Sequence, residues 1–180
     1  MRLEIEMKRL ALALIALALA APALAQPALK PPLAGLAFLV GDWRSDDGKV
    51  ADTGGTSRGV SHLTVEADGW SLLRRDRTDI TGPDGKPAGG FSQVMLIYPE
   101  AGTLRADYAD GEGHVIHYAK AEIVPGRSVV FTAEATGGAP AFRLAYELKA
   151  PGDLAVDFGM LPPGGGPFRP IARGTLHRAR

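Results

Sequence analysis

The chain has 180 residues, with 20 basic and 20 acidic side chains, 46% hydrophobic residues and no cysteine. Without an excess of Lys and Arg, binding to nucleic acid is not expected, because phosphate neutralisation needs concentrated positive charge. The lack of cysteine excludes disulfides, thiolate metal sites and cysteine nucleophiles, and a chain of this size is expected to form one domain.

The first 25 residues have the pattern of a secretory signal peptide. Met7-Lys8-Arg9 precedes the apolar run Leu10–Ala21, and Ala23-Leu24-Ala25 is a small-x-small cleavage site. A transmembrane anchor is the competing interpretation, but the run is shorter than the roughly 20 residues that spanning needs. Cleavage would leave 155 residues with 17 basic and 18 acidic groups. The sequence therefore predicts a bacterial protein that is periplasmic or secreted, without membrane insertion.

The segment after the cleavage site is expected to be an extended leader, over residues 26–35. Gln26–Pro32 contains three prolines, which disfavour regular structure. Leu33–Val40 is long enough for one helical turn. The remainder, residues 36–180, is predicted to be a single β-barrel domain.

From Gly41 onward, runs typical of strands alternate with short turns rich in Gly, Pro and Asp. Such short connections favour antiparallel hairpins, since parallel crossovers need a dozen or more residues. Alternation of apolar and polar residues is clearest in Phe142–Lys149, Ser128–Ala135 and Asp153–Phe158. Counting both ends gives about ten strands, which predicts an all-β, up-and-down antiparallel barrel. A two-sheet sandwich is the alternative.

Two stretches carry a family resemblance. Phe38-Leu39-Val40-Gly41-Asp42-Trp43 resembles the entry to lipocalin-like (calycin) barrels, in which a Gly-x-Trp tryptophan plugs the closed end. The resemblance implies structural roles for Gly41 and Trp43, and a basic residue of the last strand, Arg173 or Arg178, is expected over the tryptophan ring. The stretch Gly111–Tyr118 (GEGHVIHY) is similar to a family of uncharacterised secreted bacterial barrels.

A more distant resemblance is to nitrobindin, a heme-binding barrel. After Gly41-Asp42-Trp43 this chain continues with Arg44–Asp47 and lacks the further glycines of the nitrobindin pattern. The position of the heme-ligating histidine corresponds to Pro170 or Ile171. Heme is therefore not expected, and no other cofactor is indicated.

His117 is the first candidate for a ligand-binding residue. Strand alternation groups it with Val115, Ala119, Ala121 and Ile123, so it is predicted to face the interior near Tyr108 or Tyr146. His114 would then face outward, and the two cannot chelate one metal ion. A histidine satisfied by a neighbouring strand is the alternative. A site built from His62, His177 and a third histidine is not expected.

The charged run Arg74–Asp79 is the second candidate. Arg75, Arg77 and Asp79 share one face of the expected strand and are interpreted as an outer salt-bridge ladder. Arg74 and Asp76 share the other face with Trp70 and Leu72. This pair is the one expected to line a cavity, because a buried charge needs a partner.

The function favoured by these observations is binding or transport of an apolar or amphipathic small molecule in the barrel. His117, Tyr108, Tyr146, Arg74 and Asp76 are the predicted ligand-binding residues. One alternative is a structural or protein-interaction module, filled by side chains that include Trp43, Trp70, Phe131, Phe142, Tyr146 and Phe158. The other is a small enzyme using His117, although no nucleophile elbow, zinc-protease motif or Walker lysine supports it.

Overall fold

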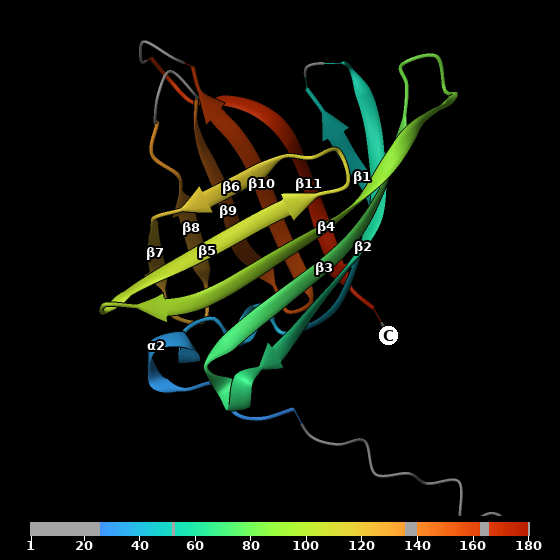
Figure 1. Cartoon of the computed structure of the whole chain (residues 1–180). Helices are drawn as coiled ribbons and strands as arrows, with labels where there is room; N and C mark the ends of the chain where they lie inside the picture. The colour runs from blue at the N-terminus through green and yellow to red at the C-terminus, as the bar shows by residue number, and fades with distance from the viewer. Residues whose placement is uncertain (1–25, 52, 136–139, 163–165, 180) are drawn as a thin grey trace, which may run out of the picture.

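The computed structural model describes residues 26–51, 53–135, 140–162 and 166–179. The predicted signal peptide lies outside these residues. Eleven antiparallel strands form one sheet that curls into a nearly closed barrel (Figure 1). The strands are β1 (Gly41–Val50), β2 (Gly55–Glu66), β3 (Ser71–Thr81), β4 (Pro87–Glu100), β5 (Thr103–Asp110), β6 (Val115–Tyr118), β7 (Lys120–Val124), β8 (Ser128–Thr132), β9 (Ala141–Ala150), β10 (Asp153–Leu161) and β11 (Arg169–Arg178).

The all-β, up-and-down architecture predicted from the turn spacing is confirmed. Consecutive strands pair within the series β1 to β6 and within the series β7 to β11, and β11 returns to pair with β1. This last pairing removes the edges that an open sheet would expose at β1 and β11. The ends of the sheet are β6 and β7, which follow one another in the sequence.

The division between β6 and β7 accounts for the strand that the sequence did not predict. The alternation that grouped His117 with Val115 and Ile123 assumes one continuous strand, but the chain changes partner at Ala119: β6 pairs with β5, and β7 pairs with β8. The alternation changes phase at the same residue. Ile116 and Tyr118 face the core before Ala119, whereas Ala121 and Ile123 pack against it afterwards.

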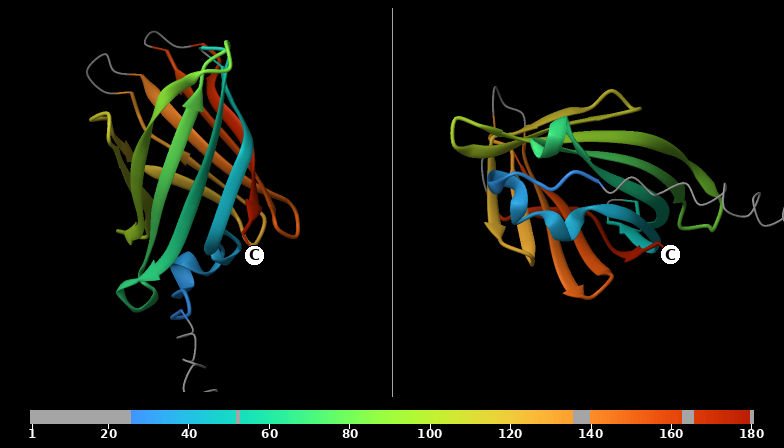
Figure 2. Two further views of the ribbon diagram at one scale, coloured as in Figure 1. Left: turned by 90° about the vertical axis from the view of Figure 1, so that its right-hand side faces the viewer. Right: turned by 90° about the horizontal axis from the view of Figure 1, so that it is seen from below.

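One end of the barrel is covered by the segment that enters β1. It contains helix α2 (Pro31–Ala34) and the 3₁₀ turn η1 (Ala37–Leu39); a second 3₁₀ turn, η2 (Ala67–Gly69), lies between β2 and β3. Seen from below, α2 and η1 lie across the barrel end (Figure 2). Leu33, Leu36 and Leu39 are completely buried in the core. The helical turn therefore begins inside the segment predicted to be extended, because its leucines plug this end of the barrel.

Trp43 occupies the position predicted from the Gly-x-Trp pattern. Its side chain is 1% exposed, and its indole Nε1 donates a hydrogen bond of 2.7 Å to the Leu39 carbonyl. Arg178 is the cross-strand neighbour of Trp43, and its guanidinium carbon lies 4.4 Å from the centre of the ring. The same guanidinium donates to the Val40 carbonyl at 3.0 Å. The predicted arginine–tryptophan contact is therefore confirmed for Arg178.

Gly41 has a structural reason to be glycine. Its φ of +123° lies in a region that favours residues without a side chain, and a Cβ atom there would collide with the Arg178 guanidinium. Arg173, the other arginine considered, pairs instead with Asp157 on the outer surface at 2.9 Å.

The predicted place of Trp70 in the core is wrong. Its side chain is 51% exposed. Trp70 follows η2 and has helical backbone angles, φ −87° and ψ −7°, so the alternation of β3 does not extend to it. Strand β4 carries apolar residues on both faces, and Val94 and Leu96 are exposed on its outer face.

The two tryptophans allow a direct test of the packed end. Trp43→Ala is expected to lower the free energy of unfolding by about 3–5 kcal/mol, because it empties a large core site. Trp70→Ala, a change of the same chemistry at an exposed position, should cost less than about 1 kcal/mol. Urea denaturation of both variants measures the difference. Equal losses would contradict the assignment of Trp43 as the plug.

Candidate functional site

The barrel interior has a packed half and a half that holds polar groups. The packed half, next to α2 and η1, contains buried side chains such as Leu72, Ile97, Phe131 and Leu154. Further along β3 the inner face continues with Arg74, Asp76 and Thr78. Arg74 is only 4% exposed, so a charged group lies inside the barrel.

The guanidinium of Arg74 contacts its own strand and three others. Its Nη1 donates to the hydroxyl of Tyr146 on β9, across the barrel, and its Nη2 donates to Gln93 Oε1 on β4 at 3.2 Å. Its Nε lies 3.0 Å from Asp76 Oδ2, an ion-pair distance, although this N–H is not aligned for a hydrogen bond. The guanidinium also lies near the ring of Tyr108 on β5, 5.8 Å from its centre.

Beside Arg74, four adjacent strands carry polar residues at one level of the barrel. Ser61 on β2 lies opposite Asp76 on β3, Asp76 lies opposite Gln93 on β4, and Gln93 lies opposite Asp110 on β5. Directly opposed residues on neighbouring strands share a face of the sheet. We call these four residues the polar row. It separates the packed half of the barrel from the end with the β1–β2, β3–β4 and β10–β11 connections.

Part of the polar row is held by protein hydrogen bonds. Gln93 donates from Nε2 to Thr78 Oγ1 at 3.0 Å while its Oε1 accepts from Arg74. Asp110 accepts the Tyr108 hydroxyl at 2.9 Å. These contacts fix the Gln93 amide and the Tyr108 ring beside Arg74.

Two oxygens of the polar row are buried without a partner. Within the part of the chain that the structure describes, Ser61 Oγ and Asp76 Oδ1 form no hydrogen bond. The Ser61 residue is 3% exposed. A buried oxygen without a partner costs about 1–3 kcal/mol, so the place where Ser61 and Asp76 adjoin favours a further polar group.

The surroundings of Arg74 keep its positive charge. Burial alone would lower the pKa of Arg74, but Asp76 and the hydroxyls of Tyr146 and Tyr118 outweigh it and raise the pKa above its ordinary value. Asp110 is also ionised: burial opposes its charge, yet hydrogen bonds from His114, Tyr108 and Glu112 hold its pKa below the usual range.

The outer face of β3 agrees with the prediction. Arg75, Arg77 and Asp79 are exposed, and Arg77 lies 3.4 Å from Asp79. The inward placement predicted for the pair Arg74 and Asp76 is likewise confirmed. Alternation sufficed here because β3 is regular from Ser71 to Thr81.

The predicted interior position of His117 is wrong. Its side chain is 77% exposed, and its Nδ1 lies 2.6 Å from Asp107 Oδ1 on the outside of the barrel. The error arises from the change of phase at Ala119, which puts Ile116 and Tyr118 inside and Val115 and His117 outside. Tyr108 and Tyr146 therefore meet Arg74 rather than His117.

The other histidines are also paired with aspartates. His62 lies 2.7 Å from Asp42, His114 lies 3.0 Å from Asp110, and His177 lies 2.8 Å from Asp153. In each pair the contacting histidine atom is Nδ1, and each pair is at least partly exposed. These contacts stabilise turns and neighbouring strands on the barrel surface.

Asp110, Glu112 and His114 bring possible metal-ligating atoms within 4.8 Å of one another. Both Asp110 oxygens already accept hydrogen bonds. Oδ1 accepts from the backbone N–H groups of Glu112 and His114 at 3.0 Å, and Oδ2 lies 3.0 Å from His114 Nδ1. These hydrogen bonds hold the β5–β6 turn, and the turn brings the three side chains close together.

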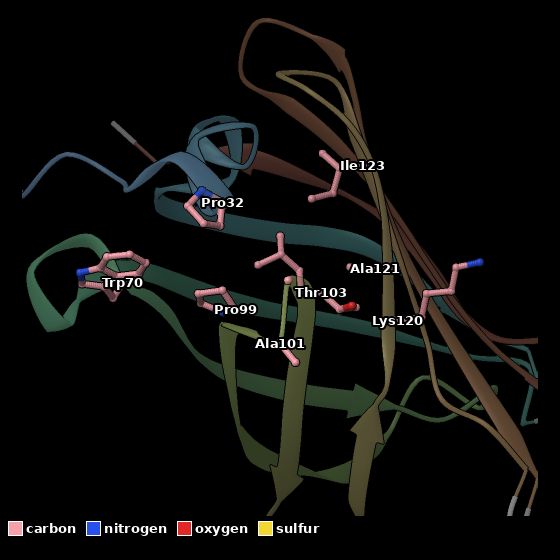
Figure 3. Close-up of a pocket in the computed structure, with 10 residues that line it drawn as sticks. Pro32, Trp70, Pro99, Ala101, Thr103, Lys120, Ala121 and Ile123 are labelled. Carbon is pink, nitrogen blue, oxygen red and sulfur yellow. The ribbon is translucent and has the colours of Figure 1, made fainter.

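A groove of about 710 Å³ lies away from these polar groups, at the packed end where β5 and β7 diverge (Figure 3). Exposed Trp70 forms one side of it, and Ala121 and Ile123 of β7 form the other. Pro32, Pro99, Ala101, Gly102, Thr103, Leu104 and Lys120 complete its lining. The groove lies where the chain changes partner at Ala119, after which β7 pairs with β8 and no longer follows β5.

No protein-family model matches the chain, and no relative was found among curated proteins. The antiparallel, nearly closed barrel is compatible with a calycin-like fold. Among the described helices, none has the length and apolar character needed to cross a membrane.

The sequence analysis missed Ser61, Gln93 and Asp110 as interior residues. Their positions depend on the register between strands: once Arg74 and Asp76 are placed inside, the residues opposite them must share that face. The Gly-, Pro- and Asp-rich stretches indicated where the turns lie, but they did not determine which residues of neighbouring strands are opposite one another.

The four tyrosines provide a test of this interior. Burial raises the pKa of Tyr108, Tyr118 and Tyr146, aided at Tyr108 by Asp110 and opposed at Tyr146 by Arg74. The hydrogen bond to Asp107 raises the pKa of Tyr98. Ultraviolet titration of the native protein should therefore show tyrosinate forming only above the ordinary pKa of about 10.

The same shifts predict how stability depends on pH. Because the folded state favours neutral tyrosine, the stabilisation is present below about pH 10 and is lost as the pH rises further. The guanidinium-unfolded protein is the control and should titrate near pH 10. Tyrosinate appearing near pH 10 in the native protein would contradict the buried environment.

Proposed function

We propose that this chain is an exported, calycin-like barrel that binds a small amphipathic molecule. The export part of the proposal rests on the signal-peptide pattern of Met1–Ala25 and the lipocalin-like part on the Gly41-x-Trp43 entry. The proposed ligand-binding residues are Arg74, Asp76, Tyr108 and Tyr146. His117 is not among them, because it faces outward.

The observation that carries the proposal is the pair of buried, unpartnered oxygens beside Arg74. Ser61 Oγ and Asp76 Oδ1 lie on the inner face of adjoining strands, next to a guanidinium that contacts β4 and β9. Structural polar networks are normally satisfied, whereas binding sites hold polar groups ready for a ligand. This arrangement supports a polar anchoring point inside the barrel.

An apolar wall extends from this anchoring point. On β9, Leu144 and Phe142 follow the same face as Tyr146 toward the end with the β8–β9 and β10–β11 connections. Phe142 stacks on Phe158 of β10, with ring centres 5.8 Å apart, and both rings are partly exposed. The four residue steps from Tyr146 to Phe142 span about 13 Å along the strand. We infer from the length of this wall a ligand with a polar end and an apolar body of about the same length.

A filled barrel that serves as an interaction module is the second candidate. The packed half, with Trp43 and Phe131 buried, supports this alternative. Trp70 belongs to the outer groove and contributes nothing to that filling. The enzyme alternative depended on an interior His117 and is not proposed.

The neutral fluorophore N-phenyl-naphthylamine, which has an apolar body and one N–H donor, tests the proposal. Its fluorescence should rise on binding to the wild-type protein. Arg74→Met should weaken this binding about tenfold or more, because it removes the cation that positions the Asp76 carboxylate, the charged acceptor for the fluorophore N–H. Arg75→Met changes the neighbouring residue on the outer face and should leave binding unchanged.

A second variant guards against misfolding, because Arg74→Met leaves the Asp76 carboxylate without its cation. Phe142→Ser alters the partly exposed apolar wall and should also weaken binding, whereas Phe168→Ser changes an exposed phenylalanine and should not. Circular dichroism checks that each variant is folded. Failure of the wild-type protein to bind, or binding that is unaffected by both Arg74→Met and Phe142→Ser, would favour the interaction module.

A further inference from the structure

We propose that the polar end of the ligand is an uncharged hydrogen-bond donor, an amide or a hydroxyl, and that a carboxylate is disfavoured. This inference rests on the proposed function and names the chemical class that the site would take. It follows from the charges on the inner face and from the hydrogen-bonding capacity left at Asp76, Ser61 and Arg74.

The polar row has no surplus of positive charge. The charged side chains directed inward at this level of the barrel are Arg74, Asp76 and Asp110, whereas Arg178, opposite Trp43, and Arg169, opposite Met160, lie at the two ends of the barrel. Asp76 offsets the charge of Arg74 at 3.0 Å, and Asp110 adds a further carboxylate at the edge of the same polar row. A carboxylate ligand would therefore meet one cation that is already paired and two anions.

The unpartnered atoms call for a donor. Asp76 Oδ1 can only accept, so a ligand N–H or O–H is the group that would satisfy it. Ser61 Oγ, on the adjoining strand, can accept or donate. A carboxylate has no hydrogen to offer either atom, and its approach would leave Asp76 Oδ1 buried beside a like charge.

Arg74 supplies the complementary donors. Each of its terminal nitrogens carries two N–H groups and uses one of them, on Tyr146 and on Gln93. A carbonyl or hydroxyl oxygen of the ligand would accept from the guanidinium while the N–H or O–H of the same group faces Asp76. A primary amide offers both functions in one plane, and a hydroxyl offers both on one oxygen.

Four probes with the same apolar chain separate charge from donor capacity: decanamide, decanol, methyl decanoate and decanoate. Methyl decanoate is neutral but has no donor, and decanoate is an anion at about pH 7.5. Displacement of N-phenyl-naphthylamine from the wild-type protein measures each affinity. We expect decanamide and decanol to bind at least about tenfold more tightly than decanoate. The affinity of methyl decanoate should lie between that of decanol and that of decanoate.

Asp76→Asn, which has nearly the same shape, should reverse the preference. The substitution removes the like charge and replaces one carboxylate oxygen with an NH2 donor, so decanoate should gain affinity relative to decanol. Asp79→Asn makes the same change on the outer face of β3 and should keep the wild-type ranking. The wild-type ranking itself tests the inference even where Asp76→Asn does not fold.

The outcomes distinguish the inference from the function on which it rests. Tightest binding of decanoate, lost in Arg74→Met, would overturn the neutral-donor inference and leave the binding function standing. Equal binding of decanol and methyl decanoate would overturn the requirement for a donor. If none of the four probes displaces the fluorophore, or if Arg74→Met changes none of their affinities, the amphipathic-ligand function fails and the inference fails with it.

Discussion

The buried guanidinium of Arg74 is the interaction on which the interior of this barrel depends. Moving a charge out of water is costly unless charged and polar partners replace the lost hydration. Asp76 supplies the charge, and Tyr146 and Gln93 supply oxygens from two other strands. One charged residue therefore requires polar side chains on several strands, and it divides a solid apolar half from a half that keeps unused hydrogen-bonding capacity.

The packed half supplies the stability that such a polar interior requires. Two sets of side chains close its end. Leu33, Leu36 and Leu39 insert from the segment before β1. Trp43 lies between the Leu39 carbonyl and the Arg178 guanidinium. Arg178 lies on the last strand, so the same contact reinforces the pairing of β1 with β11. Arg178 therefore contributes both to the closure of the barrel and to the packing of its core.

The sequence predicted what depends on local alternation and missed what depends on register. Strand β3 keeps its period of two from Ser71 to Thr81, so Arg74 and Asp76 were placed correctly. The same rule failed for His117, since a single residue, Ala119, shifts the phase between β6 and β7. Trp70 was misplaced because the alternation was extended into a turn. Ser61 and Gln93 emerged only from cross-strand pairing, which no local pattern encodes.

These differences move the candidate chemistry from histidine to arginine. An interior histidine near neutral pH would have suggested proton transfer, whereas the exposed His117–Asp107 pair leaves the interior to a guanidinium that stays charged. A permanently charged group compensated by Asp76 is suited to holding a ligand by fixed hydrogen bonds rather than to exchanging protons. Because Asp76 offsets this charge, the selectivity of the proposed binding function would depend on the hydrogen-bonding pattern at Asp76 Oδ1 and Ser61 Oγ, the oxygens whose bonds the described protein does not complete.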